Sequence, residues 1–112
     1  MPPPAFEATV VRAIDGDSVV VLRADTQREE RIRVGGVDVP SRGRDAEAGK
    51  RIVESWKGRL VRVRPTADYR VHSEMPAIVT DDQGNNLGKQ LLAHGRRLGQ
   101  FPIEASLALL RL

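Results

Sequence analysis

Short runs of alternating apolar and polar residues, each closed by turn-forming residues, constrain the fold of this chain more than any other feature. Three such runs come first, at residues 6–14, 18–24 and 29–36. In the third run, Ile32 and Val34 alternate with Arg31 and Arg33, so the two pairs fall on opposite faces of a strand. Valine-rich runs joined by short polar turns predict a meander of three strands.

The pattern then changes to a helical period. Ala48, Ile52 and Trp56 recur every four residues, which predicts a helix over 45–57 that stops at Gly58. Further along, the pattern predicts strands at 59–65 and 77–80, a helix capped by Asn86 and stopped by Gly95, and a helical tail at 103–111.

Together these elements predict a mainly β fold with helices (α+β). The architecture expected is a five-stranded Greek-key barrel of the OB type, with a helix inserted after strand three and short C-terminal helices. Residues 6–112 are expected to form a single domain after a loose tail at 1–5. An SH3-like barrel, which does not need the inserted helix, and an α+β sandwich are the alternatives.

The composition excludes several classes of site. The chain has 112 residues, no cysteine and two histidines, so disulfides and cysteine nucleophiles are excluded and a structural zinc site is disfavoured.

No signal-peptide pattern or membrane-spanning apolar run is present. We therefore expect a cytoplasmic protein with no membrane contact, or a secreted or periplasmic one if a leader has been removed. We also expect a monomer.

Arginine dominates the positive charge of the chain. It supplies 15 of the 18 basic residues, and the formal net charge is +3. Guanidinium groups bind phosphate bidentately, so one interpretation is a polyanion-binding face, and an arginine-rich solvated surface is the other. The partner expected on the first interpretation is single-stranded DNA or RNA. Its candidate binding residues are Arg31, Arg42, Arg44, Tyr69 and Arg97, beside Arg33 and Arg70.

Two aspartates lie at predicted strand ends. In the segment Asp15-Gly16-Asp17 the first two residues form a hairpin turn, which does not need Asp17. Asp38 follows the third strand, five residues after Arg33. In a curled meander these ends meet at one rim, and two carboxylates without His or Cys suit Ca²⁺ or Mg²⁺. Taken singly, each aspartate also fits a turn.

Several segments, taken in order, resemble the staphylococcal nuclease (thermonuclease) family: AIDGDS, RIRVGGVDVP, the DAEA start of the helix, GRLVRVRP and GNNLGKQLLAHGRRL. The match runs from about Ala8 to Leu98. Its most specific parts are the DGD with hydrophobic flanks and the R-x-x-x-x-D-x-P string from Arg33 to Pro40. The resemblance implies an OB-type barrel and, in active members, calcium-dependent hydrolysis of DNA and RNA phosphodiesters.

The resemblance also implies roles for individual residues. Asp17 and Asp38 fall on the aspartates that ligate calcium, and Val39 falls on a residue that offers its backbone carbonyl. Arg33 falls on the arginine that clamps the scissile phosphate, where it would neutralise charge that grows in the transition state.

Two roles of the family are left open. Ser41 occupies the position of the general-base glutamate, and serine is no base at neutral pH. The second phosphate-binding arginine corresponds to Arg70 in a gapped alignment and to Ser73 in an ungapped one. His72 is a candidate substitute base, because imidazole accepts protons near neutral pH, although an exposed loop histidine is the simpler interpretation.

Three functions therefore compete. The first is a calcium-dependent nuclease, weakened by the serine at position 41. The second is a degenerate nuclease-fold module that binds nucleic acid without cleaving it, and the third is a protein-interaction domain. OB barrels bind single strands through basic grooves and aromatic platforms, and aromatic residues are scarce here.

Overall fold

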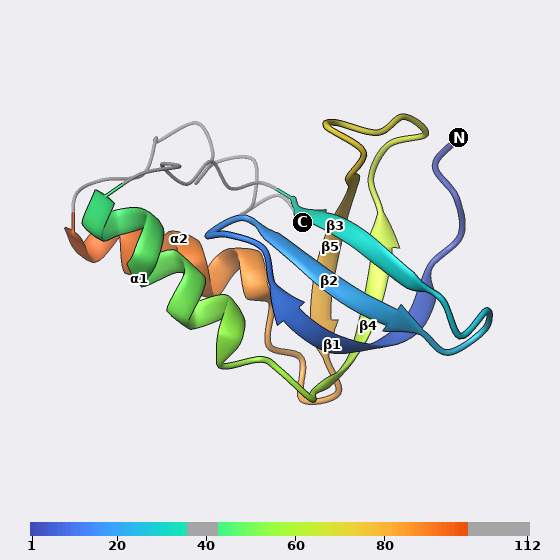
Figure 1. Ribbon diagram of the computed structural model, residues 1–112, viewed down its shortest axis with the longest axis horizontal. Coiled ribbons are helices and arrows are strands. Elements are labelled where there is room, and N and C mark those ends of the chain that lie inside the picture. The colour runs from blue at the N-terminus through green and yellow to red at the C-terminus, as the bar shows by residue number, and fades with distance from the viewer. Residues whose placement is uncertain (36–42, 99–112) are drawn as a thin grey trace.

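The computed structural model describes residues 1–35 and 43–98, and for residues 43–46 and 95–98 it describes the backbone alone. It contains strands β1 (Phe6–Ala13), β2 (Ser18–Arg23), β3 (Glu29–Val34), β4 (Leu60–Pro65) and β5 (Met75–Asp81), and helices α1 (Gly43–Glu54) and α2 (Leu87–Leu98) (Figure 1). All five predicted strands and the two helices predicted within these ranges are present.

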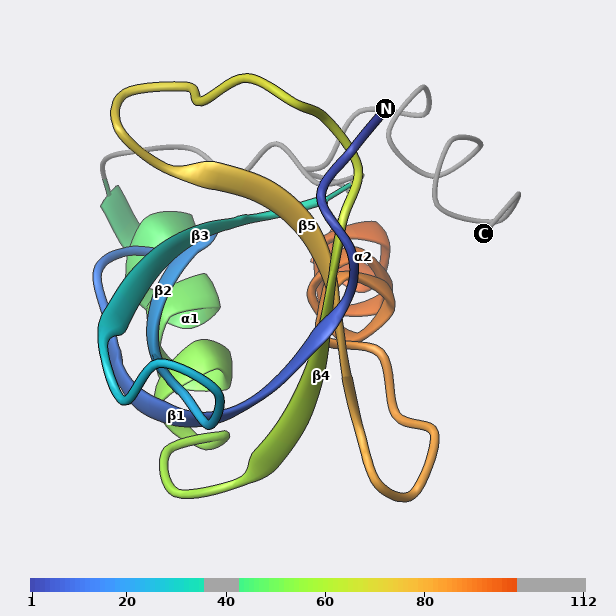
Figure 2. The same cartoon turned by 90° about the vertical axis from the view of Figure 1, so that its right-hand side faces the viewer.

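The five strands close into a barrel in the order β1-β2-β3-β5-β4, with β4 returning to β1 (Figure 2). Neighbouring strands are antiparallel except β3 and β5, which are parallel. The predicted five-stranded barrel is confirmed, and the closed sheet excludes the α+β sandwich. Helix α1 lies between β3 and β4 in the chain, where the inserted helix was predicted.

Alternation decides which side chains fill the barrel. On β3, Ile32 and Val34 are buried, and Arg31 and Arg33 lie on the outer face, as predicted. The other strands contribute in the same way, because successive side chains of a strand point to opposite faces. The strand residues in the core are Phe6, Ala8, Val10, Val19, Val21, Ile32, Val34, Val61, Val63, Met75, Ala77 and Val79.

The two helices close one end of the barrel. Figure 2 looks into the barrel and shows α1 across its far end. Val53, Trp56, Leu87 and Leu91 are fully buried and join the strand residues in one core. The Trp56 indole N–H donates to Gln90 Oε1 at 2.7 Å, which satisfies the polar atom of a buried aromatic side chain and ties the end of α1 to α2.

Most element boundaries differ from the prediction by one to three residues, and three of the differences have a local physical cause. Helix α1 begins at Gly43, two residues earlier than predicted, and ends at Glu54. It ends there because the chain from Ser55 to Gly58 follows tighter turns, and Gly58 adopts a φ of 87°. Helix α2 continues past Gly95, since an interior glycine costs a helix only about 1 kcal/mol. Strand β5 includes Pro76, whose carbonyl accepts the backbone N–H of Thr66, just past the end of β4, at 3.0 Å.

The predicted helical tail at 103–111 lies outside the described residues. Among the helices of the described ranges, none is both long and apolar enough to cross a membrane.

Candidate functional site

The loop between β1 and β2 holds Asp17 by its backbone. The Asp15 carboxylate accepts the backbone N–H of Asp17 at 3.1 Å, and the Asp17 carbonyl accepts the N–H of Val34 on β3 at 2.8 Å. Ser18 opens β2, so the loop has four residues rather than the two of the predicted tight turn. Asp15 is therefore a turn residue, as expected, and it fixes the position of Asp17.

Strand register brings Arg33 to this loop. Arg33 on β3 lies opposite Ser18 on β2, on the outer face of the barrel. Its Nη1 lies 3.5 Å from Asp17 Oδ2, while the side chain remains 31% exposed. The structure therefore brings together two residues, Asp17 and Arg33, that the sequence placed at a shared rim.

A second carboxylate, from Glu74, completes the cluster. Glu74 is 5% exposed, and its Oε1 lies 3.3 Å from Arg33 Nη2. The same oxygen accepts a hydrogen bond from the Ser18 hydroxyl at 2.9 Å. The Arg33 guanidinium is thus held between the carboxylates of Asp17 and Glu74, and these three residues with Ser18 form what we call the rim cluster.

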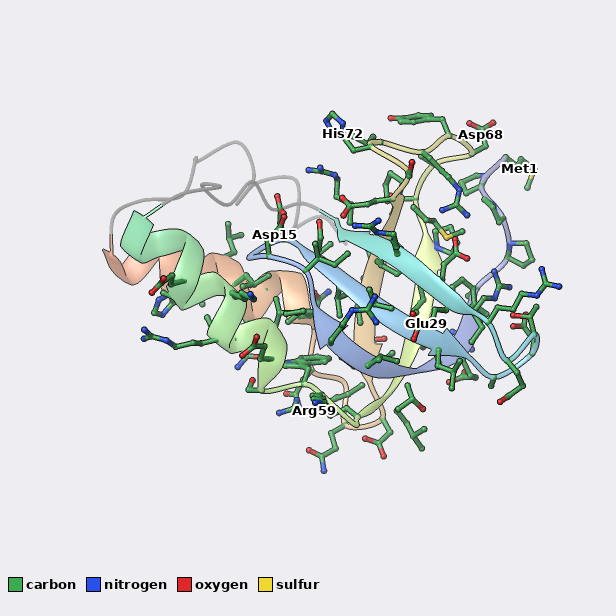
Figure 3. The ribbon with its side chains drawn as sticks, in the orientation of Figure 1. Met1, Asp15, Glu29, Arg59, Asp68 and His72 are labelled. Atoms are coloured by element: carbon green, nitrogen blue, oxygen red, sulfur yellow. The ribbon has the colours of Figure 1, made fainter. Side chains whose placement is uncertain are left out.

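A strained turn delivers Glu74 to the rim cluster. Val71 and Glu74 exchange two backbone hydrogen bonds of 2.9 Å across His72 and Ser73. His72 and Ser73 have φ values of 51° and 66°, the signature of a type I′ turn, which favours Asn and Gly. Figure 3 shows His72 at the outer tip of this loop. No sequence signal marked the turn, because neither residue is a usual one for it.

Around Asp17, negative carboxylate charge exceeds the positive charge of Arg33. Burial raises the pKa of Asp17 to about 7, and the neighbouring Asp15 and Glu74 carboxylates act in the same direction, against Arg33. Burial would also raise the pKa of Asp15, but hydrogen bonds with Asp17 and Ser18 hold it below the ordinary value. Arg33 Nε is buried without a hydrogen-bond partner among the described residues. The cluster therefore retains both an unused donor and an excess of carboxylate.

The other predicted catalytic arginine lies elsewhere. Arg70 forms an ion pair with Glu30 on β3 and donates from Nη1 to the Ser73 carbonyl at 3.2 Å. Glu30 precedes Arg33 by three residues, about 10 Å along the strand. In the described ranges, neither Arg70 nor the Ser73 side chain forms a hydrogen bond or ion pair with the rim cluster.

The predicted nucleic-acid-binding residues are described in part. Arg31 is exposed on the outer face of β3, and Tyr69 is 64% exposed. Arg44 and Arg97 belong to α1 and α2 at positions where only the backbone is described. Asp38, Val39, Ser41 and Arg42 lie outside the described residues.

The donors of the rim cluster agree in kind with the calcium that the resemblance implies. Carboxylate oxygens are what Ca²⁺ prefers, and a carboxyl group with its pKa near 7 beside two further carboxylates gains from a nearby cation. In the described ranges no three His, Asp or Glu side chains are arranged to hold a metal ion. The rim cluster alone would therefore supply only part of a coordination shell.

Comparison with known proteins adds no relative: the sequence matches no protein-family model, and no curated protein matches it significantly.

Proposed function

We propose that this chain is a staphylococcal-nuclease-like domain with an OB-type barrel that hydrolyses phosphodiesters of single-stranded DNA or RNA. The rim cluster carries the proposal, because an arginine held between two carboxylates at a strand end, with its own side chain 31% exposed, provides both a phosphate ligand and a proton acceptor. The strand order and the helix inserted after β3 support the OB-type assignment.

Arg33 is the phosphate-binding residue in this proposal. Its guanidinium presents donors in a rigid fork, and the side chain is 31% exposed. A phosphodiester oxygen at this fork replaces part of the interaction with Asp17 and Glu74. Charge that develops on the phosphate is then stabilised by a donor that the strand pairing has already positioned.

Glu74 is the proton acceptor, in the role that Ser41 cannot fill. A water oxygen attacks phosphorus, its proton passes to the Glu74 carboxylate, and one P–O ester bond breaks. The leaving oxygen takes a proton from solvent and departs as a hydroxyl. General-base catalysis of this kind contributes roughly 10²–10⁴-fold to the rate.

A calcium ion held by Asp17, which falls on a calcium-ligand position of the family, would supply positive charge that polarises the phosphate. Asp17 itself acts through its charge state, since its pKa of about 7 makes it partly protonated at neutral pH. A carboxylate that must be ionised to bind a cation makes cation binding stronger at higher pH.

The competing function is a module that binds nucleic acid without cleaving it. The contacts of Glu74 favour this alternative, because a carboxylate oxygen that already accepts from Arg33 and from the Ser18 hydroxyl is a weaker proton acceptor for an attacking water. The two functions share Arg33 and differ in whether Glu74 takes part in chemistry.

The deciding experiment measures cleavage of a single-stranded DNA oligonucleotide with Ca²⁺ and with EDTA, and follows thermal unfolding under both conditions. We expect Ca²⁺ to permit cleavage and to raise the melting temperature of the native protein, and we expect Asp17→Asn to reduce both effects. Stabilisation by Ca²⁺ without cleavage would favour the binding module. If Ca²⁺ changes neither quantity, the metal site and the hydrolytic function are both wrong.

A further inference from the structure

A groove of about 840 Å³ lies on the outer face of β4 and β5, beside the start of α2. Figure 3 shows Arg59 on the lower side of the barrel and His72 on its upper side. The residues that line the groove are Arg59, Arg62, Arg64, Ile78, Thr80, Gly84, Asn85, Asn86, Lys89 and Gln90. We call this surface the arginine groove.

The arginine groove carries excess positive charge. Its lining includes four cations and no carboxylate. Arg59 pairs with Asp81 at 3.2 Å and Arg62 pairs with Glu7 at 3.0 Å, both from outside the lining. Arg64 and Lys89 are exposed and form no ion pair with any residue in the described ranges. Two cations are thus left without a counter-charge in one concave surface.

The arrangement of these cations follows from the sheet. Arg62 and Arg64 alternate with the core residues Val61 and Val63, so both project outward, about 7 Å apart along β4. Lys89 lies in the first turn of α2, and the partial positive charge of a helix N-terminus has the same sign. The cations therefore form an elongated surface rather than a pocket for one ion.

We propose that the arginine groove binds the phosphate backbone of single-stranded nucleic acid, flanking the phosphate held by Arg33. The proposal rests on the proposed function for the identity of the ligand, and on the groove itself for its location. It adds a second contact surface on another part of the barrel and makes a polymer, rather than a mononucleotide, the preferred ligand.

The sheet connects the two surfaces. Arg33 pairs with Pro76 on β5, and Arg64 pairs with Ile78 two residues further along the same strand. Arg33 and Arg64 both project outward, so they lie two strands and two residues apart, roughly 12 Å along the barrel surface. A single flexible strand can reach from one arginine to the other.

The lining favours a nucleic-acid backbone over an acidic peptide. Arginine forks bind phosphate and carboxylate bidentately alike, so the preference comes from Asn85, Asn86 and Thr80, whose polar groups can hydrogen-bond sugars or bases. No aromatic side chain lines the groove, so stacking does not contribute there. Binding should therefore be independent of sequence and strongly dependent on salt.

The test compares two double charge reversals by fluorescence anisotropy with a labelled single-stranded oligothymidylate in EDTA. Arg64→Glu with Lys89→Glu alters the groove, and Lys50→Glu with Arg51→Glu alters exposed cations of α1. Both variants lower the net charge by four. We expect the groove variant to lose about tenfold or more in affinity and to reduce the salt slope by about 1.4, as expected for two lost phosphate contacts on a single strand. The α1 variant should change affinity less than threefold.

Each other outcome overturns the proposal. Equal losses of affinity in the two variants would show that the oligonucleotide is attracted by the net charge of the protein rather than by the groove. Unchanged affinity in the groove variant would exclude the groove as a binding surface. Polyglutamate of equal length that binds as tightly as the oligonucleotide, with the same loss in the groove variant, would assign the groove to an acidic protein. The assay measures neither cleavage nor metal binding, so its result can be interpreted even if the hydrolytic function is wrong.

Discussion

Two arginine sites on the outer surface of one barrel are neutralised to very different degrees. In the rim cluster, Arg33 lies between two carboxylates and its geometry is fixed by strand pairing and by a strained turn. In the arginine groove, Arg64 and Lys89 project into solvent with no ion pair in the described ranges. The first arrangement suits a single phosphate in one orientation, and the second suits a polymer of negative charge. Point substitutions should therefore affect the rim cluster most, and salt should affect the groove most.

The largest effect should follow from Arg33→Ala. If Arg33 clamps the scissile phosphate, cleavage of single-stranded DNA should fall by about 10³-fold or more, the size seen for phosphate-clamping arginines in phosphoryl transfer. Initial rates with Ca²⁺ measure this. Arg51→Ala, which removes an arginine with a 78% exposed side chain, is the matched control. A rate within tenfold of the native value would remove Arg33 from the chemistry.

Glu74→Gln removes the proton acceptor and, with it, the carboxylate charge that pairs with Arg33. Glutamine keeps the shape and can still accept the Ser18 hydrogen bond, but it cannot take a proton from water. The cleavage rate should fall by about 10²–10⁴-fold with oligonucleotide affinity retained. Adding Ser41→Glu to this variant should restore part of the rate. An unchanged rate in Glu74→Gln would exclude Glu74 as the proton acceptor.

Asp17 should make stability depend on pH. Burial raises its pKa from an ordinary 3.8 to about 7, so the folded state keeps a proton that the unfolded state releases. The stability from this group is complete below about pH 3.8 and is lost as pH rises through 7, on the order of 2–4 kcal/mol. Urea unfolding from pH 4 to 8 should show this loss in the native protein and much less in Asp17→Asn. Parallel profiles for the two proteins would contradict it.

The turn before Glu74 should release strain when its residues suit its geometry. His72→Asn with Ser73→Gly places the usual type I′ pair at two positions of positive φ, and should raise the free energy of unfolding by about 1 kcal/mol. Urea unfolding gives the change. If stability falls, the turn is not under strain. Cleavage should be retained, since Glu74 keeps its position.

The smallest change in stability is expected in the arginine groove. Arg62 pairs with Glu7 in an exposed position, with side chains 61% and 64% accessible. Arg62→Ala should cost less than about 1 kcal/mol of stability, the usual value of a surface pair. A larger loss, measured by urea unfolding, would show that the groove is structural and would weaken the contrast with the rim cluster.

Local patterns anticipated most of the fold and half of the described rim cluster. Alternation in β3 correctly assigned Arg33 to the outer face, and the position of Asp17 after the turn residue Asp15 suggested a role at a strand end. Glu74 was missed, because it lies 56 residues from Ser18 in the chain and its turn has no glycine or asparagine. The arginine groove was missed for a similar reason: its cations come from β4 and α2, and no periodicity links them.

The sequence by itself determined the order and type of the elements, the exclusion of cysteine chemistry and the excess of arginine, because these depend on composition and on neighbours within a few residues. Only the tertiary structure decided which arginines are neutralised and which are left free. That distinction depends on strand register, which sets Arg33 beside Asp17 and Glu74, and on the closure of β4 onto β5, which gathers Arg64 and Lys89 in one groove. Register arises from packing of the whole core, so no local segment encodes it.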